Sequence, residues 1–199
     1  MSEESGRLRI AQLRPGEGAG IAHRRSGPVG LIGVTHCPGR NLRGREVAGW
    51  NRDLDADLDA IRDFGSAALV SLMQADEMER YGVPVERVDS GVRERGMKWY
   101  HLPIVDMQAP DSRFDSQWKQ VGAQLREFLD AERNVVVHCL GGMGRAGTVA
   151  ARMLVEYGEQ PQIAIERVRE VRPGAIQTAE QEMYVLRCML FAGGAGALR

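Results

Sequence analysis

The chain has few cysteines and no long hydrophobic run, and each absence excludes a class of protein. Its three cysteines, at positions 37, 139 and 188 of 199 residues, are odd in number and far apart. That pattern is unlike a disulfide framework and favours a reducing compartment. No apolar stretch approaches the roughly 20 residues that span a bilayer, and the polar, acidic start at residues 1–5 is unlike a signal peptide. We therefore expect a cytoplasmic protein with no membrane partner.

The chain also lacks an excess of either charge. Its 26 Lys and Arg residues against 27 Asp and Glu residues give a formal net charge of -1. No nucleic acid partner is expected from such a balance, and any attraction for phosphate must be local. The length and the hydrophobic content of 43% suit one buried core. We interpret residues 1–28 as an N-terminal extension that is partly flexible or forms peripheral strands, and residues 29–199 as one domain, expected to be a monomer.

Short apolar runs alternate with segments of helical periodicity along the rest of the chain. Such alternation is typical of parallel sheets whose connections are helices. The sequence therefore predicts an α/β fold with a central, mostly parallel, twisted sheet and helices on both faces. The predicted strands are 31–34, 67–73, 99–104 and 134–138, and the predicted helices are 54–64, 75–81, 85–92, 114–129 and 147–157, with two or three more helices after them.

A glycine-rich loop at residues 140–144 follows the last predicted strand and opens a predicted helix. The backbone N–H groups of such a loop, beside a positive helix end, form a concavity for a phosphate-sized anion. Cys139 and Arg145 bracket the loop. An arginine grips two phosphate oxygens at once, and a positive environment lowers a thiol pKa from ~8.5 into the range ~3.5 to 7.5. Cys139 is the predicted nucleophile, and the predicted phosphate-binding residues are Leu140, Gly141, Gly142, Met143, Gly144 and Arg145.

Transfer of a phosphoryl group to sulfur also needs an acid for the departing oxygen and later a base for water. Asp106 and Asp111 are the candidates, because both lie in the loop that follows a predicted strand. We prefer Asp106 for this role. Asp111 directly precedes the predicted helix at 114–129, and an N-cap there satisfies free N–H groups without any catalysis.

His138 and Cys139, then five residues, then Arg145 resemble the signature of the cysteine-dependent protein phosphatases, which include tyrosine and dual-specificity types. Residues 103–111 and 174–178 are similar to the acid loop and the C-terminal glutamine loop of the kinase-associated phosphatase branch. The resemblance extends in order over residues 99–186. It implies a dual-specificity phosphatase-like fold and a metal-independent phosphatase that acts through a phosphocysteine intermediate. The implied substrate is a phosphorylated protein or peptide, and no cofactor is implied.

The resemblance also implies a role for each matching residue. Cys139 would be the nucleophile, Arg145 the phosphate clamp, and Asp106 the acid and then the base. Gln177 would orient the hydrolytic water. His138 would steady the loop through a hydrogen bond, although a histidine at a strand end is more often merely structural.

One position departs from the family pattern. A Ser or Thr usually follows the arginine and stabilises the departing thiolate, whereas this chain has Ala146. We predict a slower second step with an accumulating phosphocysteine, unless Thr148 or a water supplies the missing donor. The same departure keeps open a phosphate-binding module with little activity. Retention of Asp106 and Gln177 argues against that alternative, since binding alone needs neither residue.

Two other enzyme classes use glycine-rich loops. Residues 142–147 also spell the pattern of dinucleotide-binding folds, but that fold needs a strand ending in an acidic residue about 20 positions on. Residues 163–171 have helical spacing instead, and too little chain remains for a second half-domain. A phosphate-loop ATPase is disfavoured because no Gly-Lys-Ser/Thr follows the glycines.

Several weaker signals have simple interpretations. His36 and Cys37 with His138 and Cys139 suggest a metal site, but the spacing favours core packing, and no metal is expected. Cys37 would be a partner for a reversible disulfide with oxidised Cys139. Cys188 is interpreted as a buried small hydrophobe. Arg24 and Arg25 are interpreted as solvated surface, and residues 40–45 as solvated surface or as the lining of the substrate entrance. The loop has no lysine, which disfavours a highly anionic lipid head group, and tyrosine or serine/threonine specificity stays open.

Overall fold

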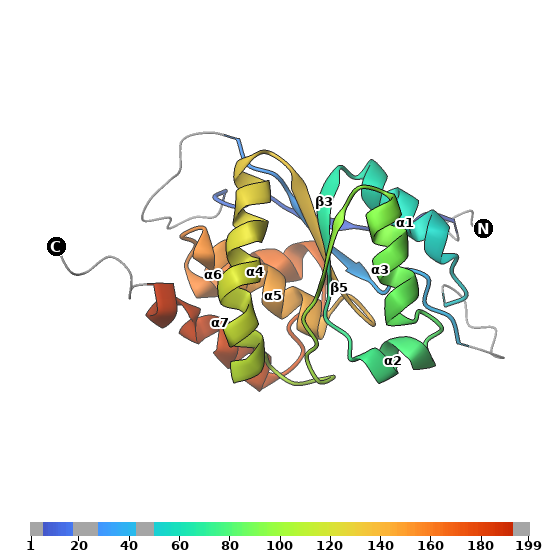
Figure 1. The fold of residues 1–199 in the computed structure, drawn as a ribbon. Helices are drawn as coiled ribbons and strands as arrows, with labels where there is room; N and C mark the ends of the chain where they lie inside the picture. The colour runs from blue at the N-terminus through green and yellow to red at the C-terminus, as the bar shows by residue number, and fades with distance from the viewer. Residues whose placement is uncertain (1–5, 18–27, 43–49, 193–199) are drawn as a thin grey trace, which may run out of the picture.

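A computed structural model of the chain describes residues 6–17, 28–42 and 50–192, with side chains as far as residue 188 (Figure 1). Its centre is a five-stranded sheet with the strand order β1-β2-β5-β3-β4. The first pair is antiparallel, and the other neighbouring strands are parallel. The predicted α/β fold with a mostly parallel sheet is therefore confirmed. The strands are β1 (Ala11–Leu13), β2 (Ile32–His36), β3 (Ser66–Ser71), β4 (Lys98–His101) and β5 (Asn134–Cys139).

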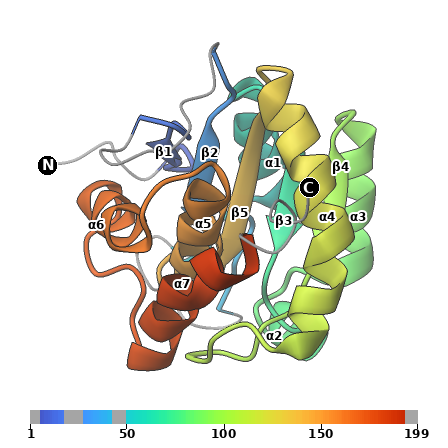
Figure 2. The ribbon, with the colours of Figure 1, turned by 90° about the vertical axis from the view of Figure 1, so that its left-hand side faces the viewer.

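Helices cover both faces of this sheet (Figures 1 and 2). One face carries α1 (Leu54–Asp63), α2 (Ala75–Arg80) and α3 (Val85–Glu94). The other face carries α4 (Ser112–Asp130), α5 (Gly144–Glu156), α6 (Pro161–Val171) and α7 (Ala179–Ala192). No helix among the described residues is both long enough and apolar enough to cross a membrane.

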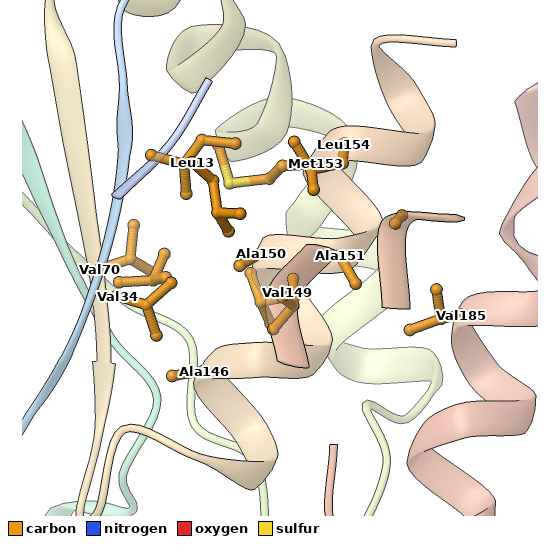
Figure 3. Packing of buried hydrophobic residues seen from close by; sticks show 14 of the residues in the cluster. Leu13, Val34, Val70, Ala146, Val149, Ala150, Ala151, Met153, Leu154 and Val185 are labelled. Carbon is orange, nitrogen blue, oxygen red and sulfur yellow. The ribbon is translucent and has the colours of Figure 1, made fainter. Parts of the chain in front are cut away.

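The middle strand β5 is buried on both sides, which explains its uninterrupted β-branched sequence. Val135 and Val137 belong to the apolar cluster beneath α4–α7, whereas Val136 belongs to the cluster beneath α1–α3. Helix α5 lies directly against this sheet through Val149 and Ala150, both fully buried (Figure 3). The helix that begins at the glycine-rich loop is thus anchored in the core.

Strand β1 lies within the segment that the sequence assigns to an N-terminal extension. Leu13 pairs with Ile32 of β2 and is buried, and Leu8 is buried as well. The described residues of this segment therefore complete one edge of the sheet. Residues 1–5 and 18–27, including Arg24 and Arg25, lie outside the described residues.

Parallel pairing places the carboxyl ends of β2, β3, β4 and β5 at one edge of the sheet. His36 lies opposite Cys139 in the register of β2 and β5, and Ser71 lies opposite His138 in the register of β3 and β5. Ligands of open α/β sheets bind at such an edge. The predicted nucleophile, the glycine-rich loop and the start of the predicted acid loop all lie there.

Candidate active site

The glycine-rich loop turns sharply as it leaves β5. Gly142 has a φ of 68°, and a Cβ atom there would lie 2.5 Å from the backbone carbonyl oxygen of Thr35. Both its conformation and its contact with β2 therefore require glycine at this position. This close approach fixes the loop against the end of the neighbouring strand.

The carbonyl oxygens of this loop are held by groups outside it. The Leu140 carbonyl accepts from the Cys37 N–H at 3.2 Å and from Arg40 Nη1 at 3.0 Å. Arg172, at the end of α6, donates from Nε to the Gly142 carbonyl at 3.0 Å and from Nη2 to the Gly141 carbonyl at 2.9 Å. The sequence leaves two interpretations of Arg40 open, as solvated surface or as lining of the substrate entrance. Its hydrogen bond to the Leu140 carbonyl places it in contact with the loop itself.

The backbone N–H groups of the same loop are arranged differently. Throughout the described part of the chain, no protein group accepts a hydrogen bond from the N–H groups of residues 140–145. The carbonyl oxygens of the loop are bonded to Arg40 and Arg172, whereas its N–H groups have no protein acceptor among the described residues. These N–H groups are therefore available to a ligand. Consecutive unpaired N–H groups at a helix start form a binding site for an anion.

Arg145 lies at the first turn of α5, and its guanidinium is almost fully enclosed. Nη1 and Nη2 donate to the two carboxylate oxygens of Glu77 at 2.6 and 2.8 Å, and Nη1 also donates to the Ile104 carbonyl at 3.2 Å. Nη2 forms a further ion pair with Asp106 at 2.9 Å. Burial by itself lowers the pKa of Arg145, but the hydrogen bonds to Glu77 and the neighbouring acidic groups raise it, so the side chain stays charged.

The Nε atom of Arg145 is buried and donates to no group among the described residues. An unpaired buried donor is costly in a native structure, so such an atom commonly serves a ligand. This atom and the N–H groups of the loop that follows Cys139 are thus donors without a protein acceptor among the described residues.

Glu77 was missed in the sequence-based prediction. It lies in α2, at the third helical position after Gln74, where its carboxylate also accepts from the Gln74 N–H at 3.3 Å. That pattern alone is typical of a helix start. Its partner Arg145 is 68 positions away, so only the folded sheet brings the two together.

His138 is fully buried and joins a chain of hydrogen bonds across the sheet. The Trp99 indole N–H donates to Ser71 Oγ at 2.8 Å, and Ser71 Oγ lies 2.6 Å from His138 Nε2. Burial lowers the pKa of His138 to about 3, so the ring is neutral at physiological pH. This chain of contacts ties the end of β5 to β3 and β4.

The two candidate acids occupy different surroundings. Asp106 lies in the loop after β4 with its side chain 62% exposed, and it reaches Arg145. Met107, next to it, has a φ of 62°, a left-handed conformation that is uncommon for a residue with a side chain. Asp111 instead caps α4 by accepting from the Phe114 N–H at 2.9 Å. Only Asp106 is therefore placed at the loop.

The glutamine loop lies over the start of α5. A Cβ atom on Gly144 would lie 2.8 Å from Gln177 Oε1, so the Gln177 side chain rests against the loop. The buried Gln181 ties this segment to the acid loop. Its Oε1 accepts from the Gln177 N–H at 2.9 Å, and its Nε2 donates to the Gln108 carbonyl at 3.1 Å.

The other cysteines belong to the core. Cys37 packs in the apolar cluster beneath α1–α3, whereas Cys139 belongs to the cluster on the other face of the sheet. Burial raises the pKa of Cys37 well above its usual range, and it raises the pKa of Cys188 to about 12. Both thiols therefore stay protonated. No group of three or more metal-ligating side chains occurs among the described residues.

The element that follows α5 bears on whether the glycine pattern belongs to a phosphatase loop or to a dinucleotide-binding fold. It is the helix α6 and not a strand, and no described strand follows β5. A dinucleotide-binding unit needs a strand at that place. In the described part of the chain, the glycine pattern is therefore not followed by the strand of a dinucleotide-binding unit.

Comparison with known proteins agrees with this geometry. The family model described as PTP-SAK, Swiss Army Knife protein, DSP-PTPase phosphatase domain, matches residues 46–185. The chain belongs to this phosphatase family. The resemblance that the sequence motifs carry is thereby confirmed, and this dual-specificity phosphatase is an enzyme that hydrolyses phosphate esters.

Two named relatives show the extent of the similarity. The chain is 29% identical over 160 residues to cyclin-dependent kinase inhibitor 3 of Rattus norvegicus, covering 79% of this phosphatase and 69% of that protein. It is 32% identical over 82 residues to a probable protein tyrosine phosphatase type IVA of Dictyostelium discoideum, covering 41% of this chain and 48% of that one.

The fold is shared with solved phosphatases. A kinase-associated phosphatase with serine in place of its catalytic-site cysteine superimposes with a TM-score of 0.77 at 23% identity, covering 96% of this chain and 99% of that one. The active form of Tk-PTP gives a TM-score of 0.60 at 26% identity, covering 79% and 90% of the two chains.

Proposed function

We propose that this phosphatase hydrolyses phosphomonoesters of proteins through a phosphocysteine intermediate on Cys139. The observation that carries the proposal is the donor set around that cysteine. It comprises the N–H groups of residues 140–145 and the buried Nε of Arg145, none of which donates to a protein acceptor among the described residues. A tetrahedral dianion accepts several such hydrogen bonds at once.

Counting the hydrogens of Arg145 indicates how the phosphate binds. A guanidinium has five N–H donors. Three of them are directed to Glu77 and Ile104, one faces Asp106, and the one on Nε is free. We infer that the phosphate takes the Nε hydrogen and displaces Asp106 from Nη2. Glu77 then keeps the guanidinium in place, and Asp106 is released to face the leaving group.

In the first chemical step, Cys139 Sγ attacks phosphorus, and the bond from phosphorus to the ester oxygen breaks. Asp106, which binds a proton from solvent once the phosphate has displaced it from Arg145, gives that proton to the oxygen as it leaves. In the second step, Asp106 takes a proton from a water that Gln177 orients. The water oxygen bonds to phosphorus, the S–P bond breaks, and inorganic phosphate and the Cys139 thiolate result.

The rim of the site suits a protein substrate. Val105 and Met107, which flank Asp106, are 46% and 50% exposed. Exposed apolar side chains beside a phosphate site offer contacts to a polypeptide that a small sugar phosphate would not use. The name of the relative cyclin-dependent kinase inhibitor 3 also connects that protein with a protein partner.

The test is hydrolysis of a small aryl phosphate in the presence of a metal chelator. Cys139→Ser should abolish activity, and Asp106→Asn should lower kcat by about a hundredfold, the size of a general-acid contribution. Cys188→Ser, which changes a buried cysteine of α7, is the matched control and should retain activity. A wild-type protein that binds phosphate through Arg145 but turns over no ester would instead identify a phosphate-reading module, and the cause would lie at Ala146.

A further inference from the structure

A cleft of about 480 Å³ opens beside the candidate active site. It is lined by Met107, Gln108 and Ala109 of the acid loop and by Glu180 in the first turn of α7. Figure 2 shows the loop after β4 passing beside the start of that helix. The cleft begins one residue after Asp106 and three residues after Gln177. A polypeptide whose phosphate reaches Cys139 therefore has flanking residues next to this cleft.

The two walls of the cleft are held at a fixed separation. Gln181 has no exposed surface, and it spans from the Gln177 N–H to the Gln108 carbonyl through the same side-chain amide. The Thr178 N–H also donates to Gln181 Oε1, at 3.4 Å. A buried amide that is bonded at both ends resists displacement, because leaving either end unpaired costs free energy. The cleft is thus a formed feature of the fold.

The chemistry of the lining selects one kind of occupant. Met107 is apolar and half-exposed, and Ala109 adds a small apolar surface. Glu180 is exposed and forms no ion pair with any described residue, whereas Asp106 and Glu182 are paired with Arg145 and Arg169. An apolar wall that ends in an uncompensated carboxylate matches an aliphatic stem that ends in a positive charge.

We propose that this cleft is a specificity subsite for a lysine or arginine side chain close to the phosphorylated residue of the substrate. This inference rests on the proposed function. The aliphatic part of that side chain lies on Met107, and its charged end pairs with Glu180. A neighbouring acidic residue or a second phosphate is disfavoured by the same carboxylate. The phosphatase is therefore selective for phosphoproteins with basic flanking sequence.

The experiment measures kcat/KM for phosphopeptides that differ at single positions within three residues of the phosphorylated one. Each position carries Lys, the neutral norleucine or Glu in turn. For the wild type, the Lys peptide should exceed the Glu peptide by about three- to tenfold at one position or more, as expected for one exposed charge pair that also contacts an apolar surface. This ratio should fall toward one with rising salt.

Substitutions at Glu180 provide the decisive comparison. Glu180→Gln should lower the Lys-to-Glu ratio to near one, and Glu180→Lys should invert it. Glu86→Gln is the matched control, because Glu86 is also an exposed glutamate in the first turn of a helix, α3, on the other face of the sheet. The ratio of the wild type should persist in this control.

Three outcomes would overturn the subsite. They are a wild-type ratio near one at every position, a ratio that survives Glu180→Lys, and a norleucine or Glu peptide that is preferred over the Lys peptide. The first two leave Glu180 with only its stabilising effect on the helix start. Hydrolysis of an aryl phosphate by the wild type, lost in Cys139→Ser, is measured in parallel. If that activity is absent, the proposed function fails, whereas activity without peptide discrimination rejects the subsite alone.

Discussion

Glu77 binds Arg145 through both carboxylate oxygens, which accept from Nη1 at 2.6 Å and from Nη2 at 2.8 Å. The pair is buried, and the Arg145 side chain is 1% exposed. Removing one partner of such a pair leaves an uncompensated charge, which costs more than the intact pair contributes. The orientation of Arg145, the proposed phosphate clamp, therefore depends on a residue in a different layer of the fold.

We expect Glu77→Gln to lower the free energy of unfolding by about 2 kcal/mol, less than full truncation because the amide oxygen still accepts one hydrogen bond. It should also raise KM for an aryl phosphate, since Arg145 is no longer held in one orientation. Urea unfolding and steady-state kinetics measure both effects. Glu79→Gln, two residues along α2 and exposed, is the control and should change neither.

The glycine-rich loop offers a closely matched pair of substitutions. Gly142→Ala places a Cβ atom 2.5 Å from Thr35 backbone at a φ of 68°, so the loop must deform. The Cβ of Gly141→Ala meets Met143 Cγ at 3.6 Å, an ordinary contact. Because phosphate binding depends on the loop geometry, we expect kcat/KM to fall at least a hundredfold in the first variant and only a few-fold in the second. Equal losses would show that bulk, and not the turn at Gly142, limits activity.

Local patterns predicted the elements, because the strand at 134–138 and the helices around it carry clear periodicity. The candidate nucleophile Cys139, the glycine-rich loop and Arg145 lie in one short segment, and Asp106 lies in the loop after another strand, so the sequence alone brings them to attention. Contacts between distant segments were not predictable. Glu77 resembles a helix-starting glutamate, and Gln181 contacts Gln108 across 73 positions. Strand β1 is only 3 residues long, too short for a reliable alternation pattern.

The pH dependence of the free energy of unfolding should reveal the lowered pKa of the buried His138. Burial lowers the pKa of His138 from 6.5 in the unfolded chain to about 3 in the folded protein. The unfolded chain therefore binds a proton more readily than the folded protein does. The contribution of the neutral His138 ring to the free energy of unfolding is complete above pH 6.5 and is lost as the pH falls toward 3. The slope for one such group is about 1.4 kcal/mol per pH unit. His36 acts in the same direction, because burial and Arg40 lower its pKa to about 4.

Chemical denaturation at a series of pH values between 7 and 4 tests this expectation. His138→Asn should be less stable than the wild type at pH 7, and the difference between the two proteins should shrink as the pH falls. The carboxylates titrate in both proteins, so the comparison isolates the histidine. A difference that stays constant with pH would mean that the pKa of His138 is the same in the folded and the unfolded protein.

We predict that Ala146 slows the second chemical step, the hydrolysis of the phosphocysteine. The departing Cys139 thiolate needs a hydroxyl donor, and the nearest candidate in sequence, Thr148, already donates to the Gly144 carbonyl at 2.8 Å within α5. A hydroxyl has one hydrogen, so Thr148 cannot serve both acceptors. We therefore expect the phosphocysteine to accumulate in the wild type. Rapid-mixing measurements should show a burst of aryl alcohol release followed by a slower steady state.

Ala146→Ser should restore a donor at the start of α5, remove the burst and raise kcat about tenfold or more, with the first step unchanged. Ala146 is fully buried, so Ala146→Cys, which adds a side chain of similar size but only a weak donor, controls for the added volume. Thr148→Val is the complementary control and should leave the burst in place. If Thr148→Val abolishes steady-state turnover instead, then its hydroxyl must leave Gly144 during catalysis, and the slow step has another cause than Ala146.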